Sequence, residues 1–209
     1  MPAESSTPDE LKTPAGRTQR LIFKPLELAD AEQIQQLFPR WEIVRYLNAD
    51  IPWPYPSDGA AGHIETCLGE MERGEKAHWA IIPRSGPADL IGRIDLWRPD
   101  DGVRHDQRGF WLDPEYQRQG LMTEAAERVT AYAFLELGWP HLWLRNAQEN
   151  HASRRIKEKQ GARLADLMIG RHVGGTGTVM VWQLVREDWL ARQPVQSKNL
   201  SRAEAGLSK

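Results

Sequence analysis

A polar turn around one glycine leads straight into a helical pattern at EYQRQGLMTEAAERVTAYAF, residues 115–134. The turn lacks the Ser, Thr, Asp or Asn that usually caps such a helix. The first N–H groups of a helix have no internal partner and carry the positive end of its dipole, so they suit a phosphate. Gly120 would let a ligand approach the backbone, and Arg118 could add charge-assisted hydrogen bonds. A plain tight turn with a solvated arginine fits the same residues, and both interpretations stay open.

Two further polar positions could do chemistry. Asn150 opens NHASRRIKEKQG, residues 150–161, where it fits a helix cap, and Ser153 falls in the first turn of that helix. His172 lies in the penultimate apolar run, and an imidazole that titrates near neutrality suits proton removal. A partly buried histidine satisfied by its neighbours is the competing interpretation.

The alternation of apolar residues predicts the elements that must position these groups. Strands are expected at 20–26, 78–84, 89–97, 107–113 and 141–146, with a closing hairpin of 162–173 and 176–185. Helices are expected at 29–38, 60–74, 121–137 and 150–161. This order predicts an α+β fold, a mixed and mostly antiparallel sheet flanked by helices. Residues 17–190 are expected to form one domain, between disordered tails at 1–16 and 191–209.

Composition narrows the classes of function. The chain has 209 residues, 40% hydrophobic and 27% charged, and a net charge of −2, which argues against a general nucleic-acid binder. Its single cysteine, Cys67, cannot form an internal disulfide. No apolar run is long enough to span a membrane, and the N-terminus lacks a secretory signal. We therefore expect a cytoplasmic protein without membrane or nucleic-acid partners, as a monomer or a homodimer.

Several motifs together resemble the GNAT acetyltransferase superfamily, and within it the RimJ/RimL-type subgroup, which acetylates protein N-terminal amines. The resemblance runs from residue 20 through the final hairpin. The motif residues are Gln117, Gly120 and Met122 in the glycine turn, Thr123, Glu124 and Ala125 after it, Asn150 and Ser153, and Glu158, Lys159 and Gly161.

The resemblance implies acetyl-CoA as the co-substrate and no metal. Its pyrophosphate would lie on the backbone of residues 117–123, and its pantetheine arm would insert between the strand at 107–112 and the strand at 141–146, which splay apart. The cofactor-binding residues implied are Leu112, Gln117, Arg118, Gln119, Gly120, Leu121, Met122, Thr123, Asn150 and Ser153.

The implied reaction is direct attack of a primary amine on the acetyl group in a ternary complex. A backbone N–H on the strand at 107–112 would stabilise the oxyanion, and Ser153 would hydrogen-bond the departing sulfur. Ser153 could equally serve only its own helix. For the base, an acidic position common in relatives holds Gln107, which leaves His172 or a water chain ending on Asp95 or Glu149.

Other departures bear on activity and on the acceptor. Lys157 stands where many relatives carry a tyrosine acid, and Met122 replaces a small residue and would narrow the approach to the phosphates. Trp53 and Tyr55, in a proline-rich loop, are expected to face the surface and form the acceptor pocket. The acceptor could be a peptide N-terminus, a polyamine, an amino acid or an aminoglycoside-like compound. The missing tyrosine and Gln107 also motivate an alternative, a catalytically weak acyl-CoA-binding sensor or partner module.

Overall fold

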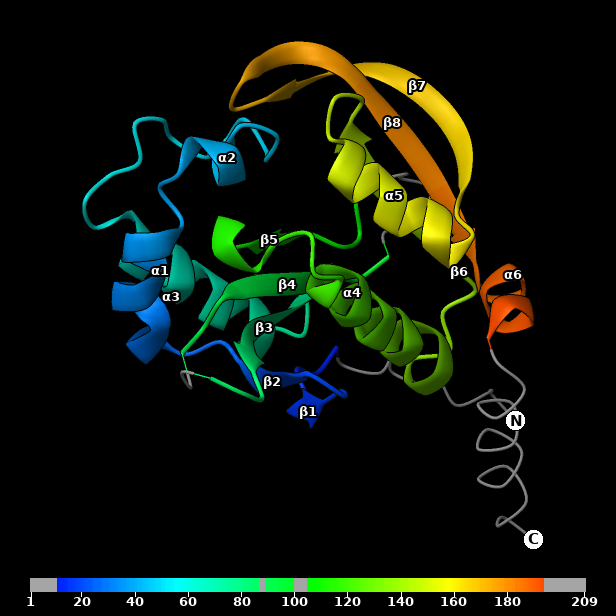
Figure 1. The fold of residues 1–209 in the computed structure, drawn as a ribbon, viewed down its shortest axis with the longest axis horizontal. Coiled ribbons are helices and arrows are strands. Elements are labelled where there is room, and N and C mark those ends of the chain that lie inside the picture. Colours follow the sequence, from blue (N-terminus) through cyan, green and yellow to red (C-terminus); the bar gives the residue numbers. More distant parts are fainter. Residues whose placement is uncertain (1–10, 87–88, 100–104, 194–209) are drawn as a thin grey trace, which may run out of the picture.

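Two antiparallel sheets form the framework of the protein (Figure 1). The computed structural model describes residues 11–86, 89–99 and 105–193. One sheet has the strand order β1-β2-β3-β4-β5 and the other the order β6-β8-β7. The strands are β1 (Gly16–Arg17), β2 (Leu21–Pro25), β3 (Lys76–Pro83), β4 (Gly92–Trp97), β5 (Phe110–Leu112), β6 (His141–Ala147), β7 (Arg163–His172) and β8 (Gly175–Val185).

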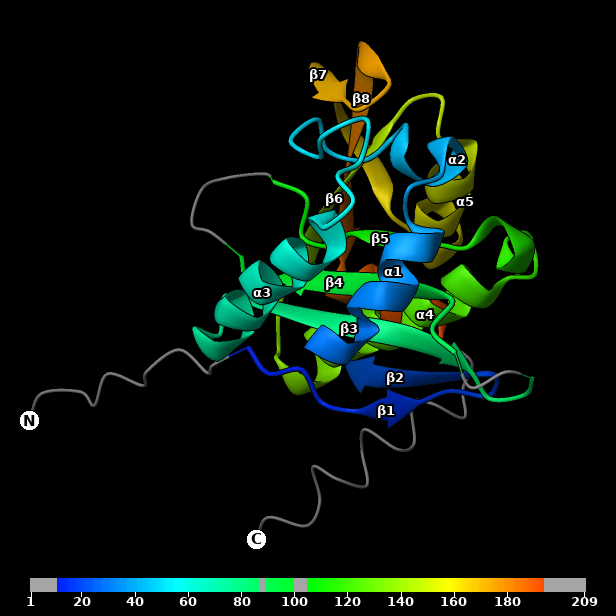
Figure 2. The ribbon, with the colours of Figure 1, turned by 90° about the vertical axis from the view of Figure 1, so that its left-hand side faces the viewer.

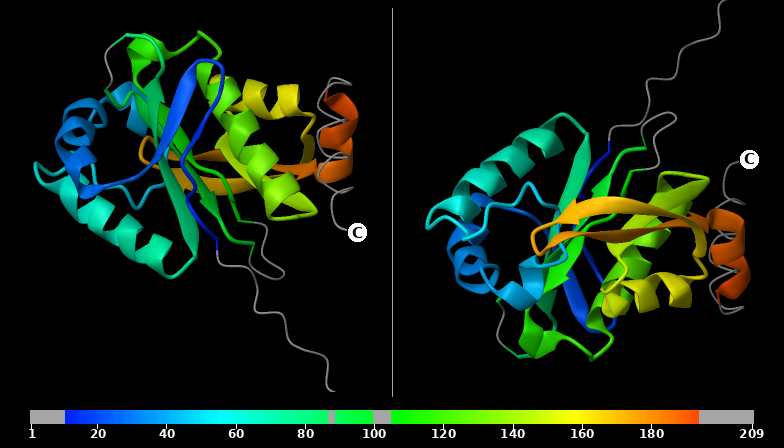
Figure 3. Two further views of the ribbon diagram at one scale, coloured as in Figure 1. Left: turned by 90° about the horizontal axis from the view of Figure 1, so that it is seen from below. Right: turned by 90° about the horizontal axis from the view of Figure 1, so that it is seen from above.

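Helices cover both faces of the five-stranded sheet, as Figure 3 shows. On one face α1 and α3 pack in a cluster with Ala80, Leu90 and Trp111, and on the other α4 packs in a cluster with Phe23, Trp79 and Ile94. The helices are η1 (Leu28–Asp30), α1 (Ala31–Leu37), α2 (Trp41–Val44), α3 (Gly59–Glu72), η2 (Pro114–Tyr116), α4 (Leu121–Ala131), η3 (Tyr132–Glu136), α5 (His151–Gln160) and α6 (Arg186–Arg192).

The two sheets separate between β5 and β6, as the sequence predicted. Gln107 holds them together just before β5 begins: its N–H donates to the Trp143 carbonyl at 2.9 Å, and its side-chain oxygen accepts the Trp143 N–H at 2.6 Å. Asp106 adds a third link by accepting the N–H of Arg145 at 3.0 Å. Beyond Gln107, β5 pairs with β4 and β6 pairs with β8, which leaves facing edges without a shared ladder. Figure 2 shows the β7–β8 hairpin projecting past the five-stranded sheet.

The chain enters the fold earlier than the expected boundary at residue 17. Leu11 is buried in the main core, and the carbonyls of Lys12 and Pro14 accept hydrogen bonds from Tyr132 and from the Trp79 indole. Residues 11–16 therefore pack on the sheet, and the expectation of a disordered tail is wrong for them. Residues 1–10 and 194–209 lie outside the described part of the chain.

The expected elements are present, with shifted ends. The helix expected at 121–137 is α4 followed by one π-helical turn, η3, and the short elements β1, α2 and α6 were not anticipated. The α+β expectation is confirmed. No helix within the described ranges is long and apolar enough to cross a membrane.

Candidate functional site

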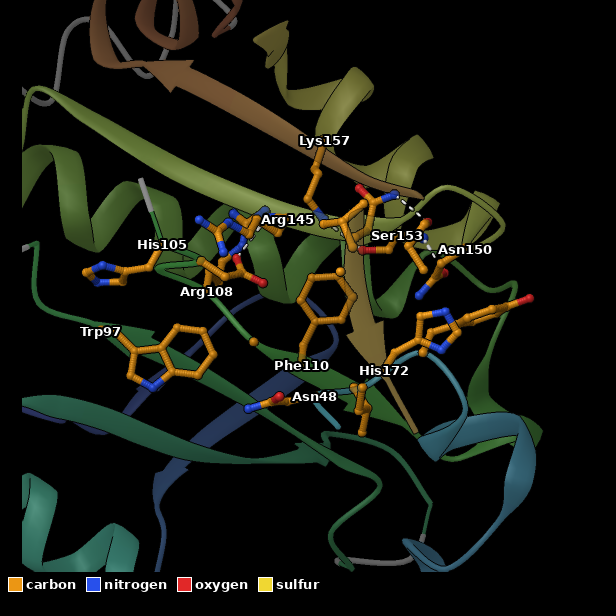
Figure 4. Close-up of a pocket in the computed structure, with 18 of the residues that line it drawn as sticks. Asn48, Trp97, His105, Arg108, Phe110, Arg145, Asn150, Ser153, Lys157 and His172 are labelled. Atoms are coloured by element: carbon orange, nitrogen blue, oxygen red, sulfur yellow. Dashed lines mark hydrogen bonds between the residues drawn. The ribbon is translucent and has the colours of Figure 1, made fainter. Parts of the chain in front are cut away.

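A pocket of about 820 Å³ opens where the two sheets part (Figure 4). Its wall includes Phe110 of β5, Asn146 of β6, the first turns of α5 and the end of β7. Among the residues expected to be functional, Asn150, Ser153 and His172 all line it. Its size is that of a small-molecule site.

The wall formed by α5 holds a lysine–serine pair. Asn150 caps the helix by accepting the Ser153 N–H at 3.1 Å, which confirms the capping interpretation. Lys157, one turn further, is 1% exposed, and its amine donates to Ser153 Oγ at 2.7 Å. Because Oγ accepts from the lysine rather than bonding the backbone, the Ser153 O–H is free to donate to a ligand. The Lys157 amine also lies 5.7 Å from the centre of the Phe110 ring.

Burial changes the acidity of Lys157. Its enclosure lowers the pKa of the amine to about 7, an effect that Asp106 opposes and Arg108 reinforces. Burial likewise raises the pKa of Asp106, which lines the same pocket. A lysine with a pKa close to neutral can both hold and release a proton under working conditions.

His172 reaches the pocket from the end of β7. Its Nδ1 lies 2.8 Å from the carbonyl oxygen of Arg45, so Nδ1 carries the hydrogen and Nε2 is left with its lone pair. The Tyr46 ring packs edge-on against the imidazole, with the ring centres 5.9 Å apart. The contacts fix the tautomer in which Nε2 can accept a proton.

The edge of β5 supplies a backbone donor. Asp95 N–H bonds to the Gly109 carbonyl, and Asp113 N–H bonds to the Ile91 carbonyl, so the odd-numbered residues of the β5 segment pair with β4. The alternation of an antiparallel ladder then turns the N–H of Phe110 toward the gap between the sheets. This is the position required of the expected oxyanion donor.

The N-terminus of α4 forms a separate feature at the far end of β5. Gly120 has φ 78°, in the left-handed region, and no side chain caps the helix. Within the described ranges, no acceptor faces the N–H groups of Leu121, Met122 and Thr123. Arg118 is also left-handed, with φ 64°, and Arg20 donates to the Gln119 carbonyl at 2.9 Å. Arg20 fixes the Gln119 carbonyl, and the N–H groups at the helix start lie beside the basic side chains of Arg20 and Arg118. A phosphate site requires such donors.

The side chains in this turn do not obstruct it. Leu121 and Met122 are buried in the main core, and the Gln117 side chain donates to the Leu112 carbonyl at 2.8 Å, tying the turn to the end of β5. The expectation that Met122 narrows the approach to the phosphates is therefore wrong, because its side chain points inward.

Trp53 and Tyr55 are not among the residues that line the pocket. Trp53 is 43% exposed, as expected of a surface residue, and stacks at a tilt on Trp41. Tyr55 is half-buried, and its ring contacts Phe38 with centres 5.1 Å apart in the core beneath α1 and α3. Tyr55 is therefore a packing residue here, contrary to the surface position expected for it.

Gln107, which stands at the acidic position of relatives, is 2% exposed and its side chain bonds the Trp143 backbone between the sheets. The alternative bases expected from the sequence, Asp95 and Glu149, are poorly placed. Asp95 bonds to His78 and Arg93, and although burial acts in the opposite sense, their charges hold its pKa well below the usual range. Glu149 is exposed and is not part of the pocket wall.

Beneath α3 lies a cluster of charged groups away from the pocket. Cys67, Glu70 and His78 offer ligand atoms within 4.8 Å of one another, a spacing that a metal ion could use. However, both ring nitrogens of His78 already bond carboxylates, Nδ1 to Asp95 at 2.8 Å and Nε2 to Glu70 at 3.0 Å. Although burial opposes it, Asp95 raises the pKa of His78 to about 10, so the imidazolium has no lone pair for a metal. The cluster is a buried ion-pair network.

Lys157 is a functional candidate that the sequence indicated only as a departure from the tyrosine of many relatives. A lysine four residues after Ser153, next to the apolar Ile156, falls on the inward face of α5, and this spacing is a signal that could have identified the pair. No comparable sequence pattern pointed to Asp106, and none singled out the backbone of Phe110 within the strand at 107–112.

Known proteins are similar to this chain in sequence and in fold. Residues 20–163 match the model of the acetyltransferase (GNAT) domain. The probable N-acetyltransferase YjcK of Bacillus subtilis is 30% identical over 68% of this chain and 79% of its own length. The uncharacterized N-acetyltransferase YoaA of the same organism is 28% identical over 71% and 82%.

A solved structure has the same architecture. RimL, a ribosomal L7/L12 alpha-N-protein acetyltransferase in complex with coenzyme A, superposes with a TM-score of 0.68 at 15% identity and covers 80% of this chain and 95% of its own. The family model spans most of the described domain and includes the glycine turn, β5, β6 and α5. The chain therefore belongs to the GNAT acetyltransferase family.

Proposed function

We propose that the protein transfers the acetyl group of acetyl-CoA directly to a primary amine in a ternary complex, with a protein N-terminus as the leading acceptor. The observation that carries the proposal is the pocket itself. An imidazole with a free Nε2, His172, and a serine with a free O–H, Ser153, line one cavity beside the unpaired edge of β5.

Acetyl-CoA would span the two features of the site. Its pyrophosphate would lie on the free N–H groups at the start of α4, and its pantetheine arm would follow the β5 edge from Leu112 toward Phe110. The arm would hydrogen-bond the edges of β5 and β6 in place of a strand, and the thioester would then lie near Ser153.

Each chemical requirement has a candidate group. His172 Nε2 takes the proton of the attacking ammonium, directly or through water. The amine attacks the acetyl carbonyl, the Phe110 N–H stabilises the oxyanion, and the nitrogen loses its second proton to solvent water as the amide forms. When the carbon–sulfur bond breaks, its electron pair goes to sulfur, and the Ser153 hydroxyl donates to it.

The acceptor proposal draws on two observations. The pocket wall includes Asn48 and Arg171 of β7, which are both exposed, so the wall reaches the surface there, as a chain terminus would need. RimL, which shares the fold, is by name a ribosomal L7/L12 alpha-N-protein acetyltransferase.

The test is release of thiol from acetyl-CoA in the presence of an acceptor panel: a peptide with a free N-terminus, a polyamine, an amino acid and an aminoglycoside. The same peptide with a blocked N-terminus is the matched control. We expect release with the free peptide and background release with the blocked one. Tight coenzyme A binding without release on any amine would replace the enzyme proposal by the acyl-CoA sensor. Release only with the polyamine or aminoglycoside would overturn the acceptor assignment.

A further inference from the structure

Lys157 stands out in the described chain as a buried amine with no carboxylate within ion-pair distance, since Asp106 acts on it only from farther away. It is 1% exposed, and among the described residues its hydrogen-bond partner is Ser153 Oγ at 2.7 Å. Burying an amine costs several kcal/mol unless it is paired, so a lysine at this position needs an explanation. Helix packing does not supply one, because a methionine would fill the same volume without that cost.

The position of Lys157 connects it to the pocket through one atom. Figure 4 shows Lys157 reaching down from α5 to Ser153, above the Phe110 ring. Its amine donates to Ser153 Oγ, so the serine hydrogen remains available to a group in the cavity that Ser153 lines. This arrangement forms a two-member chain of proton donors that ends at the pocket wall.

We propose that Lys157 is the proton reservoir behind Ser153, and that it supplies the proton gained by the thiolate when the acetyl group is transferred. This inference rests on the proposed function. The carbon–sulfur bond breaks with its electron pair on sulfur, the Ser153 O–H proton moves to sulfur, and a Lys157 N–H proton moves to Ser153 Oγ. Lys157 is left as a neutral amine and regains a proton from solvent between turnovers. A serine hydroxyl alone is a weak acid, and the proton that Lys157 gives to Ser153 Oγ keeps the serine from being left as an alkoxide.

The charged surroundings allow this cycle. Asp106 and Arg108, both from the segment that leads into β5, are the charged groups that act on Lys157, and their effects oppose each other. Burial by itself favours the neutral form of the Lys157 amine, so the loss of its proton carries no desolvation cost. Arg108 bonds the Ala126 carbonyl and Gln160 and holds its position between α4 and α5.

The test uses coenzyme A as its probe and needs no acceptor. Thiolate absorbance of bound coenzyme A is titrated against pH in the wild type, in Lys157→Met and in Lys159→Met, a change of an exposed lysine on the same helix. Because the pKa of Lys157 is about 7, its amine is neutral at the pH where a thiol ionises, about 8.5, so the thiol should ionise alike in wild type, Lys159→Met and Lys157→Met. Melting curves of all variants establish that they are folded.

Turnover then separates charge from proton donation. Lys157→Met should lower kcat by about a hundred-fold and abolish the fall of kcat as pH rises past about 7. Lys157→Arg places a permanent cation there that does not release its proton near neutral pH, so the thiol should ionise about one pH unit lower than in the wild type while kcat stays reduced.

The outcomes are distinct. If the wild type turns over and a folded Lys157→Met matches it in kcat and in the fall of kcat above pH 7, Lys157 is not the reservoir, and the proposed function stands. If the wild type neither binds coenzyme A nor releases thiol, the proposed function fails and this inference fails with it.

Discussion

Replacing Gly120 with valine tests the expected phosphate cradle at the start of α4. An added Cβ would have as its nearest neighbour the Arg20 guanidinium at 3.5 Å, an ordinary contact, so the methyl groups extend over the open N–H groups. Gly120 has φ 78°, and a left-handed conformation costs a non-glycine residue roughly 1–2 kcal/mol. For a chain of this size, that corresponds to a fall in Tm of about 2–8 °C.

The chain offers a matched control in Gly138. It has φ 69°, and a Cβ there would meet nothing within 4 Å, so Gly138→Val carries a similar backbone cost far from the turn. Losing one charge-assisted hydrogen bond to phosphate costs roughly 1.5–3 kcal/mol, which is at least a tenfold loss of affinity. We expect calorimetry to show that loss of coenzyme A affinity in Gly120→Val only, with similar losses of Tm in both variants. Equal coenzyme A affinity in the two folded variants would refute the cradle.

Three further changes test the rest of the site and the fold. Ser153→Ala should lower kcat by roughly a hundred-fold at saturating acetyl-CoA with little change in its affinity, because Asn150 already caps the helix; wild-type kcat would end the assignment. His172→Ala should lower turnover near neutral pH and recover at high pH, where the amine loses its proton unaided, and an unchanged pH–rate profile would remove His172 from the mechanism. His78→Gln should cost up to roughly 3–5 kcal/mol of stability, because it removes the buried cation shared by Asp95 and Glu70 and leaves Asp95 with Arg93 and Glu70 with Lys76. Because the folded pKa of His78 is raised, this stabilisation is complete below pH 6.5 and is lost as pH rises through about 10, so the difference in Tm between the two proteins should shrink over that range; a constant difference would contradict it.

Local signals in the sequence were enough for the elements and for the polar residues at their ends. The residue types of Gly120 and Asn150 predict where α4 and α5 begin, and in the structure both helices begin at these residues. Such signals depend on neighbours a few residues apart, and sequence patterns carry them directly.

Contacts between segments that are far apart in the chain have no comparable pattern in the sequence. The burial of Tyr55 depends on Phe38, seventeen residues earlier, and the fixed tautomer of His172 depends on the carbonyl of Arg45. The role of Gln107 depends on the backbone of Trp143. The Lys157–Ser153 pair is local in sequence, but its meaning depends on burial against β5, which spacing alone does not reveal.

The joint at Gln107 has a consequence for how the molecule opens. Three hydrogen bonds at Asp106 and Gln107 connect the two sheets at the closed end of the gap, one between backbones and two from the N–H groups of Trp143 and Arg145 to side-chain oxygens. The sheets share one hydrophobic core, so the facing edges of β5 and β6, rather than whole halves of the molecule, are expected to exchange their amide hydrogens fastest. A ligand that fills the gap would cover these edges, and at a hundred times its Kd it would add about 2.7 kcal/mol of stability. Protection would then rise together along the facing edges of β5 and β6, and occupancy of the gap could be followed by hydrogen exchange without any turnover.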